Sequence, residues 1–262
     1  MRGRHLPTAN IEHGEHAADK VKAVRINQER ENRQVLLALA NSIQERDIVT
    51  YEHSRRVATY AQRLARSLGW NRRDARDLAL ASLVHDLGKT WIGNDILLKS
   101  EALSDEERRT IERHPVIGAR ILIGCDVHPF YVETVLYHHE AWDGHGYPTG
   151  LRGEEIPLSA RILTVADVYD VLTSQRPYST PMSVSAARER ILLGASRSFD
   201  PTIARAFVHL LDAHPDFTLP ERFCALPARF SAKTPPRTTI SDIEAHPPAV
   251  NGLHTNTFLA SI

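Results

Sequence analysis

Seven histidine and aspartate side chains occupy apolar or helix-end positions in the middle of the sequence, where an unpaired polar group is costly. His85 and Asp86 lie within the apolar run LALASLVHDLGK, and burying them costs several kcal/mol unless they are paired or bind a metal. A single buried histidine is usually a core residue with a satisfied hydrogen bond. The same pattern recurs, however, at His53, His114, His138, His139 and Asp167. A shared metal site in the interior would satisfy all of these side chains.

The number and types of these side chains indicate which metals the site would bind. Five imidazoles and two carboxylates are more than one tetrahedral ion can use, and they suit two ions about 3.5–4 Å apart that share a carboxylate. Helical bundles hold such pairs with side chains that point inward. Imidazole and carboxylate without thiolate favour iron or manganese over structural zinc. The expected cofactors are therefore two divalent ions, Fe or Mn.

The elements that must position these side chains are predicted to be helices. Apolar residues recur at steps of three and four from Val57 to Leu68, which is typical of an amphipathic helix that ends at Gly69. Runs of β-branched residues with a period of two are missing. We therefore expect an all-α fold, a helical bundle with the metal site in its core. The other expected helices span residues 19–46, 78–87, 104–114, 115–124, 129–140, 158–174, 183–193 and 201–213.

Differences in composition divide the chain into three segments. Residues 1–33 are expected to form a flexible N-terminus and a lead-in helix, and residues 34–213 the metal-binding domain. Residues 214–262 are rich in Pro, Ser and Thr and have no periodic pattern, which predicts a disordered tail.

The overall composition excludes several classes of protein. Lys plus Arg equals Asp plus Glu at 32 each, and this balance argues against a nucleic-acid polymer as partner. No apolar run reaches the roughly 18 residues of a membrane span, and the N-terminus lacks a signal-peptide core. Cys125 and Cys224 match no CxxC pattern and indicate free thiols in a reducing compartment. We expect a cytoplasmic protein that does not bind membranes.

Several ordered motifs cover most of residues 34–213. They are His53-x-x-Arg56-Val57, His85-Asp86-x-Gly88-Lys89, His114-Pro115-x-x-Gly118, His138-His139-Glu140, Asp143-Gly144-x-Gly146-Tyr147-Pro148, Ala166-Asp167-Val168-Tyr169-Asp170 and Arg176-Pro177-Tyr178. His-Asp alone is a weak signal, but the ordered set is specific. It resembles the HD-GYP subgroup of the HD phosphohydrolases.

This resemblance implies an HD-type helical bundle and a phosphodiesterase that hydrolyses cyclic di-GMP to pGpG, to GMP or to both in second-messenger signalling. It implies that one ion is held by His53, His85, Asp86 and Asp167. Asp86 would bridge to a second ion held by His114 and His138, with His139 nearby as a ligand. A metal ion also suits the chemistry, because it can lower the pKa of bound water from about 16 to about 7 and so supply a nucleophile at neutral pH.

The resemblance also implies residues that bind or activate the substrate. Lys89 would act with Asp86 in catalysis by neutralising charge on the phosphate. The loop of Gly146, Tyr147 and Pro148 would shape the substrate cleft, and Arg176 would contact a phosphate. Asp143 would either orient the substrate or cap the turn of this loop.

The sequence departs from the family pattern at four positions. Members of the family that bind three metals carry a glutamate four residues before the first histidine. Val49 stands at that position in this sequence, so we expect two ions. Trp91 replaces a glycine in the loop after Lys89 and would reshape or gate that loop. Ser179 stands where a basic residue is common, and the loss of a charged contact there is worth roughly 1.5–3 kcal/mol. Thr149 stands where a basic or amide residue is common.

Two alternative functions stay open. The changes at Trp91, Thr149 and Ser179 would fit a hydrolase of another cyclic dinucleotide or nucleotide. A non-catalytic receptor or scaffold would instead use the Tyr147-Pro148 loop to bind a partner, such as a diguanylate cyclase or a regulatory protein. Replacing Asp86 distinguishes these functions, because hydrolysis would be lost while scaffolding would survive.

Overall fold

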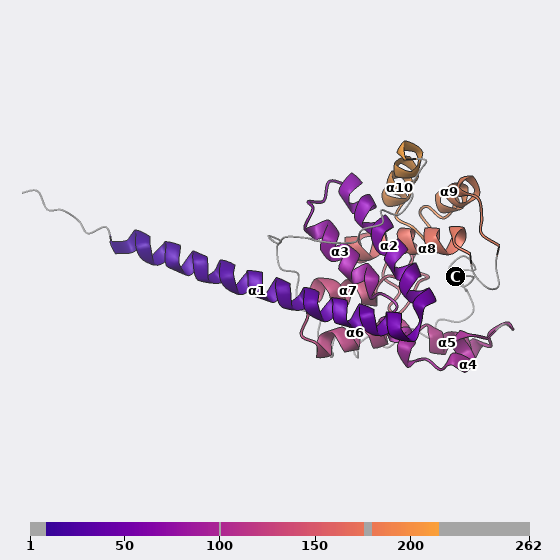
Figure 1. Cartoon of the computed structure of the whole chain (residues 1–262). Helices are drawn as coiled ribbons and strands as arrows, with labels where there is room; N and C mark the ends of the chain where they lie inside the picture. Colours follow the sequence, from indigo (N-terminus) through magenta and orange to yellow (C-terminus); the bar gives the residue numbers. More distant parts are fainter. Residues whose placement is uncertain (1–8, 100, 176–179, 215–262) are drawn as a thin grey trace, which may run out of the picture.

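The computed structural model describes residues 9–99, 101–175 and 180–214, and its regular elements in these ranges are helices (Figure 1). The expected all-α class is therefore confirmed. The α-helices are α1 (Ala9–Arg46), α2 (Ile48–Ser67), α3 (Asp74–Leu83), α4 (Asn94–Leu97), α5 (Asp105–Ile111), α6 (His114–Gly124), α7 (Pro129–Leu136), α8 (Leu158–Thr173), α9 (Val184–Leu193) and α10 (Pro201–Ala213). Two short 3₁₀ helices are η1 (Leu87–Trp91) and η2 (Gly153–Glu155). The predicted disordered tail, Cys224, Arg176 and Ser179 lie outside the described residues.

The lead-in helix α1 begins ten residues earlier than predicted, because no proline interrupts the helix formers that follow Pro7. Its C-terminal half packs against the body of the protein through Leu36, Ala40 and Ile43, which are at most 1% exposed. Its N-terminal half projects beyond the other helices (Figure 1). The helix crosses residue 34 without a break.

Local signals place most of the other helix boundaries. Asp47 caps α2 by accepting hydrogen bonds from the backbone N–H groups of Val49 and Thr50. Gly69 follows this helix with a φ of +88°, a conformation that glycine adopts without strain. The capping box of Ser104 and Glu107 that opens α5 is confirmed.

Three helix ends near the predicted ligands differ from the prediction. The helix α3 ends at Leu83 instead of residue 87, and α7 ends at Leu136 instead of residue 140. His114 opens α6 instead of closing the helix before it. These apolar stretches carry no glycine at the helix end, so periodicity alone extended the predicted helices too far.

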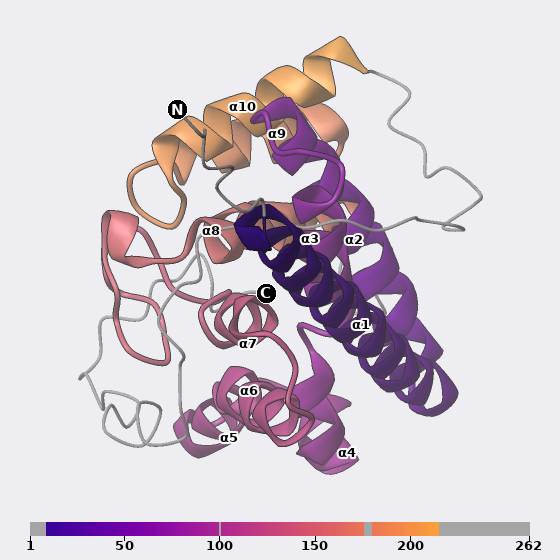
Figure 2. The ribbon, with the colours of Figure 1, turned by 90° about the vertical axis from the view of Figure 1, so that its left-hand side faces the viewer.

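Two hydrophobic clusters build the interior. The first joins α2, α8, α9 and α10 to the first half of α3. The second joins α1, α6 and α7 to the second half of α3. Figure 2 shows α9 and α10 at one end of the molecule and α4, α5 and α6 at the other. Among the described residues, no helix is long and apolar enough to span a membrane.

Candidate metal centre

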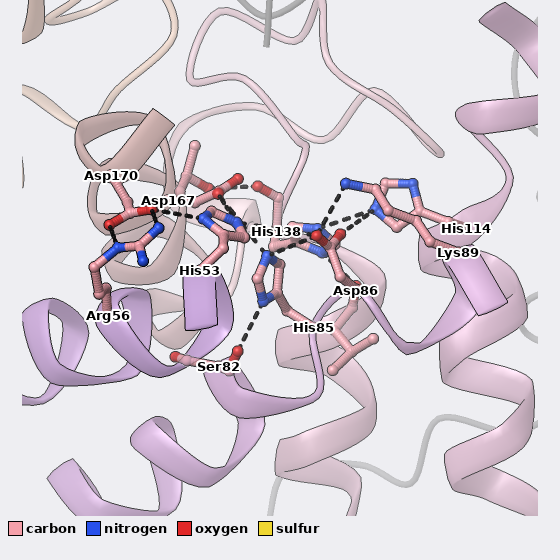
Figure 3. A network of polar contacts seen from close by, with 12 residues as sticks. His53, Arg56, Ser82, His85, Asp86, Lys89, His114, His138, Asp167 and Asp170 are labelled. Carbon is pink, nitrogen blue, oxygen red and sulfur yellow. Dashed lines mark hydrogen bonds and ion pairs between the residues drawn. The ribbon is translucent and has the colours of Figure 1, made fainter. Parts of the chain in front are cut away.

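The predicted ligands come from five segments and meet between the two hydrophobic clusters (Figure 3). His53 lies on α2 and Asp167 on α8, whereas the others lie at or just beyond a helix end. His85-Asp86 follows α3, His114 opens α6, and His138-His139 follows α7. Each of these side chains is buried.

Asp86 lies at the centre of the cluster and faces two groups of ligands. Its Oδ2 is 3.5 Å from Nε2 of His85 and 4.0 Å from Nε2 of His53. Asp167 completes this side, because its Oδ1 is 3.1 Å from Nε2 of His53 and 3.8 Å from Nε2 of His85. The other oxygen of Asp86, Oδ1, is 3.3 Å from Nε2 of His114. One carboxylate therefore points at two separate sets of nitrogen atoms.

We call these two sets the first site and the second site. The first site consists of His53, His85, Asp167 and Oδ2 of Asp86. The second site consists of His114, His138, His139 and Oδ1 of Asp86. The three histidines of the second site bring their ligand atoms within 4.8 Å of one another, as do His53, His85 and Asp86.

Backbone carbonyls fix the orientation of three imidazoles. In each case Nδ1–H donates to the carbonyl three residues earlier, which can only accept. The Nδ1–O distances are 2.7 Å for His85 to Ser82, 2.8 Å for His114 to Ile111 and 2.7 Å for His138 to Val135. In the neutral ring, Nε2 then carries a lone pair directed into the centre. Carbonyl groups at a helix end, which have no partner within the helix, thus hold an imidazole ring in the orientation that a metal ligand needs.

Several atoms of the centre lack the partner that burial demands. Nε2 of His85 and Oδ1 of Asp86 are buried and have no hydrogen bond within the protein. Nε2 of His114 and Nε2 of His138 are 3.3 Å apart, so two lone pairs face each other when both rings are neutral. Such contacts are unfavourable unless a cation lies between the atoms. The donor set is imidazole and carboxylate, which fits two ions of the iron or manganese type.

The protonation states differ between the two sites. At the second site, burial lowers the pKa of His138 to about 4 and lowers the pKa values of His114 and His139 well below the usual value. At the first site, burial opposes protonation of His53, but its hydrogen bonds to Asp167 and Asp170 raise the pKa of this ring to about 9. Second-site rings are therefore neutral at physiological pH, whereas His53 carries a proton in the metal-free protein.

Both carboxylates of the centre are ionised despite their burial. Burial would raise the pKa of Asp86, but His85 and Lys89 outweigh that effect and hold it well below the usual range. Burial opposes ionisation of Asp167 in the same way, and its hydrogen bond with His53 again lowers the pKa. Lys89 Nζ is 2.9 Å from Oδ2 of Asp86, and its side chain is 32% exposed. Lys89 is thus the partly exposed partner of a buried carboxylate.

A close backbone contact sets the position of Asp86. A Cβ atom on Gly88 would lie 1.9 Å from the carbonyl oxygen of His114, so only glycine lets η1 approach α6 this closely. This approach brings Asp86 to His114. The glycine of the predicted motif therefore has a structural explanation.

The Asp143–Pro148 loop packs against the second site. The ring of Tyr147 stacks on His139, with 4.9 Å between the ring centres and 25° between the planes. A Cβ atom on Gly146 would lie 2.2 Å from the backbone nitrogen of Ala141, so glycine is required there as well. The Tyr147-Pro148 peptide bond is cis, and Pro148 is buried.

Asp143 orders the start of this loop. Its Oδ1 accepts a hydrogen bond from the backbone N–H of His145 at 3.1 Å and lies 3.3 Å from Nδ1 of that ring. These contacts favour the turn-capping interpretation of Asp143, while a contact of Asp143 with substrate stays a prediction.

Three of the four unusual positions lie within the described residues. Thr149 donates its hydroxyl to Oε1 of the buried Glu140 at 2.6 Å, and its backbone N–H donates to the same oxygen at 2.7 Å. Thr149 therefore holds the loop in place. Trp91, at the end of η1, is 75% exposed, and Val49, one turn before His53, is 66% exposed. Val49 offers no side-chain ligand atom, and the number of ions stays a prediction.

Three residues with polar roles in the centre or its loop received no role from the sequence. Asp170 and Arg56 support His53 from behind (Figure 3), and Glu140 anchors the loop through Thr149 and Gly150. All three lie within the quoted motifs. Asp170 follows Asp167 by three residues on a helix, and this spacing could have indicated that both side chains share one face.

Comparisons with known proteins agree with this geometry. A family model described as an HD domain matches residues 38–203. The chain is 39% identical over 182 residues to the cyclic di-GMP phosphodiesterase response regulator RpfG of Xanthomonas campestris pv. campestris, covering 69% of this chain and 48% of that protein. It is 36% identical over 187 residues to the 3'3'-cGAMP-specific phosphodiesterase 2 of Vibrio cholerae serotype O1, covering 71% of this chain and 35% of that protein.

The chain thus spans about half the length of these curated relatives, or less. Among solved structures, the HDGYP protein Bd1817 from Bdellovibrio bacteriovorus matches with a TM-score of 0.55 and 19% identity, covering 74% of this chain and 68% of that one. This likeness supports the fold.

Proposed function

The chain belongs to the HD domain family, and we propose on this basis that it is a metal-dependent phosphodiesterase that hydrolyses cyclic di-GMP. The observation that carries the proposal is Asp86, whose two oxygens face two separate sets of imidazole nitrogens. We also propose that the protein acts in the cytoplasm and that its two ions are iron or manganese.

The buried residues of the two sites would hold a pair of divalent ions. Such a pair supplies a nucleophile by lowering the pKa of water, and it offsets negative charge on a phosphodiester. Asp86 would bridge the ions, since each of its oxygens already faces one site. The carbonyl-held rings of His85, His114 and His138 would present Nε2 without rearrangement.

Lys89 and the Asp143–Pro148 loop would act on the substrate. The ammonium group of Lys89 lies 2.9 Å from Asp86 and would stabilise negative charge that develops on the phosphate. Tyr147 would form one wall of the substrate cleft while it keeps His139 in place by stacking. Arg176 is proposed to contact a phosphate.

Turnover of cyclic di-GMP by metal-loaded protein tests this proposal. The protein is loaded with Fe²⁺ or Mn²⁺ under anaerobic conditions, and the products pGpG and GMP are resolved by chromatography. Asp86→Asn should abolish turnover because it removes the bridging charge. Asp95→Asn, at an exposed position on the short helix α4, is the matched control and should keep full turnover.

The same assay separates the alternatives. We include 3'3'-cGAMP as a second substrate because a Vibrio cholerae relative is named as specific for it. Preference for 3'3'-cGAMP would change the substrate but keep the reaction. If the protein binds two ions and cleaves neither compound, a hydrolase of another cyclic dinucleotide or nucleotide is favoured, and if it binds no metal, a receptor or scaffold replaces the enzyme. The buried position of Pro148 argues against a scaffold that presents this proline to a partner.

A further inference from the structure

The helices α2 and α8 present two matching pairs of polar residues to each other. His53 and Arg56 are three residues apart on α2, and Asp167 and Asp170 are three residues apart on α8. Residues at this spacing lie on the same face of a helix. Asp167 belongs to the first site, whereas Asp170 lies one turn further along α8, behind His53 (Figure 3).

The contacts of Asp170 use both of its oxygens. Oδ1 accepts from Nε of Arg56 at 2.7 Å, and Oδ2 accepts from Nη2 of Arg56 at 2.9 Å. The same Oδ2 is 2.7 Å from Nδ1 of His53. Asp170 is 0% exposed, and among the described residues His53 and Arg56 are the groups that stabilise its charge.

This arrangement fixes both nitrogens of the His53 ring. The guanidinium group of Arg56 does not lose its proton in proteins, so it keeps Asp170 as a carboxylate that can only accept. Nδ1 of His53 must therefore be the donor. Nε2 then points at Oδ1 of Asp167, 3.1 Å away, where the first ion would lie.

The support of His53 differs from that of the three carbonyl-held rings. Those rings donate to neutral carbonyl groups, whereas His53 donates to a charged carboxylate. A carboxylate behind an imidazole increases the basicity of the ligand nitrogen. A buried ion pair is, by contrast, weak evidence for stability, since apolar residues of similar volume often stabilise a protein equally well. The contacts of Asp170 are therefore better explained by its effect on His53.

We propose that Asp170, held by Arg56, is a positioning residue that orients His53 and strengthens the first site for its metal ion. This inference rests on the proposed function, because it assumes that the two sites bind ions. It assigns to Asp170 and Arg56 a role in the affinity of one site only. The second site, held by neutral carbonyls, should not depend on them.

The test measures Mn²⁺ affinity at each site separately. In a His114→Ala background the second site is disabled, and the first site is titrated with Mn²⁺ while free Mn²⁺ is followed by electron paramagnetic resonance. Asp170→Asn should weaken binding about 10- to 100-fold, as is typical for the loss of a partner behind a metal ligand. In an Asp167→Ala background, which disables the first site, the same substitution should leave Mn²⁺ affinity unchanged.

The pair of Asp200 and Arg161 provides a matched control. It is another carboxylate–guanidinium pair of low exposure, with a distance of 2.7 Å, and it contacts none of the ligands. Asp200→Asn should therefore leave Mn²⁺ affinity at both sites unchanged. Circular dichroism and thermal melting show which variants are folded.

A second variant covers the case in which Asp170→Asn does not fold. Arg56→Lys keeps the positive charge but loses the paired hydrogen bonds, and it should weaken the first site by a smaller factor. Unchanged first-site affinity in the folded variants would overturn the positioning role while leaving the proposed function intact. If wild-type protein binds no Mn²⁺, the proposed function fails and the inference fails with it.

Discussion

Four of the five imidazoles of the centre use one nitrogen for support and leave the other for a metal ion. The support is a neutral carbonyl for His85, His114 and His138, and a carboxylate for His53. The hydrogen bonds of His53 to Asp167 and Asp170 raise the pKa of this ring, so it carries a proton before metal binds. This difference in support also makes the two sites chemically different, although both consist mainly of histidine.

The difference predicts that only the first ion displaces a proton. Its site contains His53, whose pKa is about 9 in the metal-free protein, so below that pH an ion must displace a proton from Nε2. First-site Mn²⁺ affinity should therefore rise up to tenfold per pH unit between pH 6.5 and 8.5. Second-site affinity should stay nearly constant, since the His138 pKa is already lowered to about 4.

Calorimetry measures this effect directly. Mn²⁺ binding in two buffers of different ionisation enthalpy gives the number of protons released per ion. We expect about one proton for the first ion and none for the second at pH 7.5. Equal release by both ions would contradict the protonation states assigned to the two sites.

At the scale of elements, helices were easier to predict from the sequence than their ends. The periodicity of α2 and the caps at Gly69 and Ser104 are local signals, and the structure confirms them. The ends of α3 and α7 depend instead on side-chain hydrogen bonds to the helix backbone. His85 and His138 bind the last carbonyls of these helices with their own rings, and no local sequence signal marks that arrangement.

The candidate site, like the helices, could be predicted from the sequence only in part. Polar residues at apolar positions indicated the ligands, because burial without a partner is costly. The partners of Asp170 and Glu140 were not indicated: Arg56 comes from a distant helix, and the contact of Thr149 with Glu140 depends on the folded course of the loop between them. The structure was needed to bring these residues together.

The packing of η1 against α6 gives a prediction at this scale. Gly88→Ala would place a Cβ atom 1.9 Å from the carbonyl oxygen of His114, so η1 must move away from α6 and take Asp86 with it. We expect a loss of about 1–3 kcal/mol in the free energy of unfolding, as for other overpacked sites, together with weaker binding of the second ion.

Gly124→Ala is the matched control for this substitution. Gly124 ends α6, and a Cβ atom there would meet nothing within 4 Å. This variant should be as stable as wild type or more stable by up to about 1 kcal/mol, because alanine loses less chain entropy on folding. Urea denaturation measures both variants. Equal free energies of unfolding for Gly88→Ala and Gly124→Ala would show that the close contact of Gly88 with α6 is not required for stability.

At the scale of the whole molecule, the centre lies where the two hydrophobic clusters meet. The first site takes His53 and Asp167 from α2 and α8, which belong to one cluster. The second site takes its histidines from the start of α6 and the end of α7, which belong to the other. Asp86 follows α3, the helix that contributes to both clusters. Two bound ions would therefore connect the halves of the molecule through Asp86.

Metal removal should consequently weaken the contact between the two halves as well as the total stability. An ion at a hundred times its dissociation constant adds about 2.7 kcal/mol to the free energy of unfolding.

Metal-free protein should also exchange amide hydrogens faster in residues 83–91 and 135–140, which carry ligands but lie mostly outside the α-helices. Hydrogen exchange with and without Mn²⁺ measures this, and Asp86→Asn should show no protection by Mn²⁺. If the ions join the two halves, Mn²⁺ must protect these ligand-bearing residues more than the rest of the protein. Uniform protection across all helices would therefore mean that the ions stabilise the fold without specifically joining its halves.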